Sequence, residues 1–122
     1  MKIHTWVIAT ITTLLMLNVG PVVAHHGLEG YDTSKLIELK GKVVGMELMD
    51  PHSVLFVDVE NEDGTVTSWV IEGGSAYGIV RAGLSRDSLD SEPTVTILGY
   101  QSIDRNCTPR CKANGRDFTF EK

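Results

Sequence analysis

The segment that most constrains the fold is LIELKGKVVGMELMD, residues 36–50, because it is typical of one unusually long β-strand. Up to Val43, apolar residues alternate with charged ones, which places the two kinds on opposite faces of a strand. Near Val44 and Gly45 the phase shifts, and Val44, Met46 and Leu48 then continue the apolar pattern. A phase change at a glycine is typical of a β-bulge. We therefore expect a long first strand that bends near its middle.

Four shorter segments also have strand-like patterns, and we expect them to form the other strands: residues 53–60, 65–72, 92–101 and 116–122. The tight turn NEDG, residues 61–64, makes a hairpin of the first two of these.

The period changes after residue 72. Ser75 is suited to the N-cap of a helix and Gly83 to its C-terminal cap, which predicts a short helix over 76–82. Ser85 predicts a further turn over 85–89, and residues 102–115 are expected to form a long loop.

The resulting order is strand, strand, strand, helix, strand, strand. With its bent first strand, this order resembles the OB-fold, a partly open five-stranded Greek-key barrel. The resemblance implies an all-β domain with a small helix between strands 3 and 4. It also implies ligand binding near the loops that join strands 1 to 2 and 4 to 5, here 49–53 and 102–115. We expect these two loops to lie at one end of the barrel.

Residues 1–24 are expected to be a secretory signal peptide. Lys2 gives a positive start, an apolar stretch runs over residues 6–17, and Val22-Val23-Ala24 offers a cleavage site of small residues. The alternative is an uncleaved anchor, which would be the chain's only contact with a membrane. The apolar stretch, however, is interrupted before the ~20 residues that a span needs. We therefore expect residues 25–122 to form a single OB-like barrel domain in the periplasm or outside the cell.

Without residues 1–24, which hold Lys2 and no acidic residue, the formal charge changes from −5 to −6. This acidic balance argues against a nucleic-acid partner, which requires a basic face.

Cleavage after Ala24 would make His25 the first residue of the exported chain, with His26 beside it. The α-amine and imidazole of His25 can chelate a metal together, and a second imidazole would complete a flat set of three nitrogens. Cu(II) prefers such sites and has the highest affinity in the divalent series. His52 is the expected second arm of this histidine brace, because it is the only downstream histidine outside the pair; His26 competes with it. The alternative is that these histidines are ordinary surface residues.

Four neighbouring residues are weaker candidates. Asp50 is suited to orient the His52 ring as a hydrogen-bond acceptor. Met46 and Met49 offer thioethers, which suit Cu(I), and Tyr31 is suited to an axial position over a copper ion. Each has an ordinary alternative, because Asp50 can serve only the turn, the methionines can fill the core, and Tyr31 can pack the N-terminal arm onto the barrel.

In an oxidising compartment, Cys107 and Cys111 are expected to form a disulfide. Their three-residue gap differs from the two-residue gap of common zinc and thioredoxin motifs. Thiolate metal binding or redox activity is the alternative.

Several segments together resemble a bacterial family of small exported proteins, domain-of-unknown-function family 6152. They are AHHG, YDTSKLIELKGKVVGMELMDPHSVLFVDV, GGSAYGIVRAGLSRDSL and VTILGY. The family pattern has a His pair after the signal peptide and Asn-Pro-His in the first turn, where this chain has Asp50-Pro51-His52. It also has Arg-Gly-Trp after the helix, where this chain has Ala82-Gly83-Leu84 without the tryptophan. The resemblance implies export and the same histidines, but no reaction.

The sequence therefore favours an exported copper carrier or accessory protein, with a metal ion and a periplasmic protein as its expected partners. No nucleophile, phosphate-loop or dinucleotide motif indicates an enzyme. The alternative is a binding module without metal that holds a small molecule, a glycan or a protein. A third hypothesis is a small copper oxidase that uses Tyr31.

Overall fold

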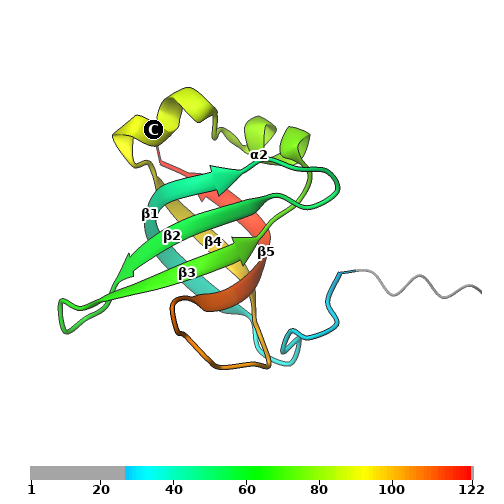
Figure 1. Ribbon diagram of the computed structural model, residues 1–122, viewed down its shortest axis with the longest axis vertical. Coiled ribbons are helices and arrows are strands. Elements are labelled where there is room, and N and C mark those ends of the chain that lie inside the picture. The colour runs from blue at the N-terminus through cyan, green and yellow to red at the C-terminus, as the bar shows by residue number, and fades with distance from the viewer. Residues whose placement is uncertain (1–26, 122) are drawn as a thin grey trace, which may run out of the picture.

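Five strands pair in the order β1-β2-β3-β5-β4 and close into a barrel (Figure 1) in the computed structural model, which describes residues 27–121. Strands β3 and β5 pair in parallel, and the other neighbours are antiparallel. The strands are β1 (Ile37–Glu47), β2 (Val54–Glu60), β3 (Val66–Glu72), β4 (Thr94–Gln101) and β5 (Cys111–Phe120). The predicted all-β, OB-like barrel is confirmed.

The bend in β1 lies where the sequence predicts it. Residues Ile37–Lys42 pair with β4, and residues Lys42–Glu47 pair with β2. Between Val43 and Gly45 the register with β2 shifts. The irregularity therefore lies where one strand passes from its first neighbour to its second, which is how β1 belongs to both sides of the barrel.

The interior of the barrel is apolar. Trp69 is the largest side chain in it, and the fully enclosed aliphatic side chains come from all four of the strands β1 to β4. These are Val43, Leu55, Val57, Ile71, Val95 and Ile97.

Helix α2 (Ala76–Ala82) and the 3₁₀ helix η1 (Arg86–Ser91) lie together beside the barrel (Figure 1). The side chain of Ser75 accepts the N–H of Gly78 at 3.1 Å, and Gly83 ends α2 in the left-handed conformation, φ 119°. Both predicted caps are thus confirmed. Ile79 of α2 and Leu84 after it are buried in the core, which fixes the helix against the strands.

The last strand is longer than predicted. Strand β5 begins at Cys111, whereas we expected a loop to residue 115 and a strand from 116. Asn114-Gly115 is typical of a turn, but here both residues pair within the sheet: Asn114 lies opposite Glu72 of β3, and Gly115 lies opposite Gly99 of β4. The Phe118 ring covers Gly115 so closely that an added Cβ would lie 2.3 Å from Cζ of that ring. Tertiary packing thus overrides the local turn signal.

The two loops that we expected at one end of the barrel adjoin opposite ends of β1. Strand β4 ends beside the start of β1, where Gly99 lies opposite Ile37, and β2 begins opposite Glu47 at its end. In Figure 1 the loop after β1 lies beside α2, whereas the loop of residues 102–110, which contains Cys107 and is called the cysteine loop below, lies away from α2. Gln101 lies opposite Ala113, and Ala113 lies opposite Ile71, so the end of β4 is still level with the end of β3, beside which Ser53 holds the loop after β1.

The predicted disulfide is present. Cys107 of the loop is bonded to Cys111, which is buried at the start of β5 opposite Trp69. Both cysteines are therefore unavailable as thiolate ligands. In the part of the chain that the structure describes, no helix is long and apolar enough to cross a membrane.

Gly99 provides a test of the packing between β4 and β5, because a Cβ added there would lie 2.1 Å from the carbonyl oxygen of Asn114. We expect Gly99→Ala to lower the free energy of unfolding by roughly 2 kcal/mol or more, as overpacking against backbone does. Gly74→Ala is the matched control, since an added Cβ meets nothing within 4 Å there. Urea unfolding followed by circular dichroism measures both, and equal stability of the two variants would contradict the packing described.

Candidate functional site

His52 lies at the end of the loop between β1 and β2, directly before a residue that is firmly held. The N–H of Ser53 donates to Gly74 O at 2.8 Å, and the N–H of Gly73 donates to Ser53 O at 2.7 Å. The Ser53 hydroxyl closes the loop by donating to Met49 O at 3.1 Å. The backbone of His52 is thus fixed beside the end of β3, and its side chain is 42% exposed.

Glu72, the last residue of β3, contacts two side chains with its two carboxylate oxygens. Oε2 accepts the hydroxyl of Tyr31 at 2.8 Å, and Oε1 lies 3.6 Å from Nδ1 of His52. The second distance is longer than a hydrogen bond, so the carboxylate and the imidazole are close neighbours that are not bonded to each other. Glu72 therefore links the loop that bears His52 to the N-terminal segment.

Sequence reasoning missed Glu72, although a signal was present. The turn after β2 sets the hairpin register, in which Glu60 lies opposite Val66 and Val54 opposite Glu72. Counting back from the predicted turn would have placed Glu72 beside the residues that follow His52.

The N-terminal segment, residues 27–35, is attached to the end of β4. Tyr31 forms an isolated bridge with Ser102, and the N–H of Asp32 donates to Gln101 O at 2.8 Å. Before Tyr31 the chain makes a tight turn, in which the N–H of Tyr31 donates to Leu28 O at 3.1 Å and Gly30 has φ 89°. This turn leads the chain back toward Gly27.

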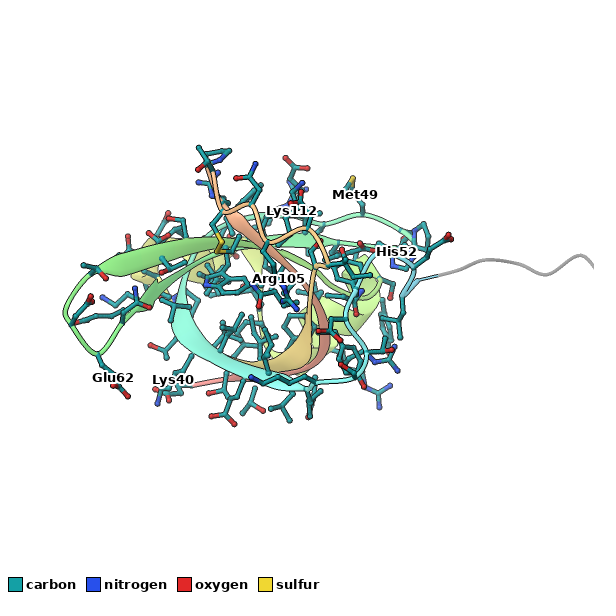
Figure 2. The ribbon with its side chains drawn as sticks, turned by 90° about the horizontal axis from the view of Figure 1, so that it is seen from below. Lys40, Met49, His52, Glu62, Arg105 and Lys112 are labelled. Carbon is teal, nitrogen blue, oxygen red and sulfur yellow. A yellow bond between two sulfur atoms is a disulfide. The ribbon has the colours of Figure 1, made fainter. Side chains whose placement is uncertain are left out.

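Gly27, the first described residue, lines the same open cleft as His52. The cleft has a volume of about 390 Å³ and lies between the N-terminal segment, α2 and β5. Glycines at 73, 74, 78 and 115 leave it open, and Ile79 and Phe118 form part of its apolar lining. Figure 2 shows His52 on the side of the barrel where the described chain begins.

Three of the weaker candidates have other contacts or surroundings in the structure. Asp50 accepts the N–H of Ala76 at 3.1 Å through one carboxylate oxygen, so it holds the start of α2. Met46 packs against the core. Met49 is exposed, and in Figure 2 its side chain projects outward from the loop.

The side chains of Tyr31 and Asp32 both have pKa values shifted from their ordinary values. Burial, followed by the hydrogen bond to Glu72 and the negative charge of that carboxylate, raises the pKa of Tyr31 well above its ordinary value. The hydroxyl and the backbone N–H of Ser34, together with the Arg105 guanidinium, lower the pKa of Asp32. The Tyr31 phenol is thus held neutral and bonded to Glu72, and the Asp32–Arg105 pair adds a link from the N-terminal segment to the cysteine loop.

Within residues 27–121, no three side chains of His, Cys, Asp or Glu are grouped so that they could hold a metal ion. The predicted ligands His25 and His26 lie outside the described residues. Of the predicted nitrogen ligands, the structure therefore places His52 alone, beside the cleft where the described chain starts.

Comparison with known proteins identifies the family. Residues 14–110 match a family of unknown function, DUF6152, and the chain belongs to that family. No curated protein matches the chain.

The hydrogen bond between Tyr31 and Glu72 predicts a late phenol titration. Because the folded state favours the neutral phenol, Tyr31 ionises above the ordinary tyrosine pKa of about 10. The unfolded chain loses this proton first, so the contribution to stability is complete below about pH 10 and is lost as pH rises toward the folded pKa.

A difference titration of phenolate absorbance between the wild type and Tyr31→Phe isolates this step. We expect its midpoint above the ordinary value and a smaller loss of stability at alkaline pH in the variant. A midpoint at or below about 10 would contradict the contact.

Proposed function

We propose that the exported protein binds copper through the α-amine and imidazole of His25 together with the imidazole of His52, as a carrier or accessory protein of the periplasm or the exterior. The observation that supports this most is that Gly27 and His52 line one cleft. Two residues of chain span at most about 7 Å. His25 and His26 are therefore covalently tethered within reach of the cleft that His52 lines.

The donor set supports copper over other divalent ions. An amine and two imidazoles are three nitrogens that fit a tetragonal site, and Cu(II) has the highest affinity for such ligands in the divalent series. Nε2 of His52 is the ring nitrogen left for the metal, because Glu72 lies beside Nδ1.

The surroundings of His52 favour a carrier over an oxidase. The imidazole is 42% exposed in an open cleft, so a partner protein can approach a metal bound there. The phenol of Tyr31 is already bonded to Glu72 at 2.8 Å, which leaves it poorly placed for the axial position that an oxidase would use.

The test is a Cu(II) titration of the exported protein, with its N-terminus established by intact mass. Fluorescence of Trp69 and electron paramagnetic resonance report the binding. We expect one nitrogen-rich site. An added N-terminal Ala, or His52→Ala, should each weaken it by more than about 100-fold, since changes beyond the direct ligands alone cost about 10- to 100-fold.

His26→Ala tests whether His52 or His26 supplies the second imidazole, and we expect this variant to retain the site. Loss of the site in His26→Ala but not in His52→Ala would assign the second arm to His26. Weak binding that is indifferent to all three changes would contradict a copper function. The cleft, whose volume lies within the ~300–1,000 Å³ of small-molecule sites, would then favour a binding module without metal.

A further inference from the structure

We propose that Glu72 and Tyr31 are the positioning residues of this metal site. The single carboxylate of Glu72 then holds both arms of the site, which are the imidazole of His52 and the N-terminal segment that leads to His25. The inference rests on the proposed copper function and assigns roles that the sequence pattern had given to Asp50 and to an axial Tyr31. It follows from the placement of one carboxylate between two segments that are remote in sequence.

One arm is the imidazole of His52. The loop that bears it is fixed through Ser53, but the ring itself is partly exposed and is free to rotate about its side-chain bonds. A small rotation of the ring would let the Glu72 oxygen, now 3.6 Å from Nδ1, accept a hydrogen bond from that nitrogen, which would leave Nε2 for the metal. Imidazoles that bind metals commonly have a carboxylate behind them in this way, and it fixes both the tautomer and the orientation of the ring.

The other arm is the N-terminal segment, residues 27–35, which leads to His25. Tyr31 is joined to the end of β4 through its backbone and to the end of β3 through its hydroxyl. The tight turn over residues 28–31 then directs the chain to Gly27 in the cleft. Without the hydroxyl bond, the segment that leads to Gly27 would be joined to the end of β4 alone, and binding would have to order it further.

Asp50 does not fill this role, although it lies only two residues from His52. Its carboxylate accepts the N–H of Ala76, and the same N–H also lies 3.0 Å from Met49 O. Asp50 therefore supports the junction between the loop and α2. It also provides a matched control, since Asp50→Asn removes one negative charge near the site but retains an acceptor oxygen for Ala76.

The two arms can be separated by substitution. Glu72→Gln keeps one acceptor oxygen for Tyr31 but removes the carboxylate beside His52. Tyr31→Phe keeps that carboxylate but removes the hydroxyl bond that joins the N-terminal segment to the end of β3. Tyr77→Phe is the control for Tyr31→Phe, because Tyr77 lies on α2 and is 71% exposed.

The experiment measures Cu(II) affinity and the paramagnetic resonance spectrum of these variants in two forms of the exported protein, one with its native N-terminus and one extended by Ala. With the native N-terminus, we expect Glu72→Gln and Tyr31→Phe each to weaken binding about 10- to 100-fold. Asp50→Asn and Tyr77→Phe should bind as the wild type does. In the extended form, Tyr31→Phe should have no further effect, because the arm that it positions is already lost, whereas Glu72→Gln should still weaken the remaining binding to His52.

This pattern distinguishes positioning from general destabilisation, which would weaken binding in both forms alike. Circular dichroism of the metal-free variants checks that each is folded. If the wild type has the site with two arms but Glu72→Gln and Tyr31→Phe bind copper as tightly, the positioning inference is overturned and the copper function stands. If the wild type has no such site, the proposed function itself fails.

Discussion

The parallel pairing of β3 with β5 is the constraint on which the rest of this structure depends. The antiparallel strands alone form an open sheet in the order β4-β1-β2-β3, and β5 closes it by pairing with β4 on one side and β3 on the other. This closure places Trp69 beside Cys111 and Glu72 beside Asn114. It also brings the end of β4, to which the N-terminal segment is attached, close to the end of β3. Tyr31 and Glu72 can form a hydrogen bond across 41 residues of sequence because the barrel is closed.

The candidate site is built on the outside of this closed barrel from parts held by backbone hydrogen bonds. His52 precedes a serine that is paired with the end of the β2–β3 hairpin, and Tyr31 is bridged to the residue after β4. Glu72 joins the two, and Gly27 and His52 share one cleft. If the proposed copper site forms, this arrangement would reduce the ordering that metal binding requires of the segment before Tyr31.

The sequence predicts those features whose causes are local. The bulge of β1 follows from a phase change at Gly45, and the caps of α2 follow from Ser75 and Gly83. The start of β5 could not be predicted in this way, because Asn114-Gly115 has the local signature of a turn and becomes a strand only through pairing with β3 and cover by Phe118. The role of Glu72 was missed for a similar reason: its partners belong to a loop 20 residues earlier and a segment 41 residues earlier. Asp50, the neighbour in sequence, was the natural candidate for that role, but its carboxylate accepts the N–H of Ala76.

The most direct test of the central claim, that the N-terminal arm and His52 meet at one metal, is to map where Cu(II) binds. Amide spectra of the ¹⁵N-labelled protein that begins at His25 would be recorded as Cu(II) is added below one equivalent, so that resonances near the bound ion broaden. We predict broadening centred on the cleft, at residues 27, 28, 52, 53, 73 and 74, while the hairpin turn at residues 61–64 stays sharp at the other end of β2 and β3. Broadening confined to the first few residues, without loss at residues 52–53 and 73–74, would contradict the claim.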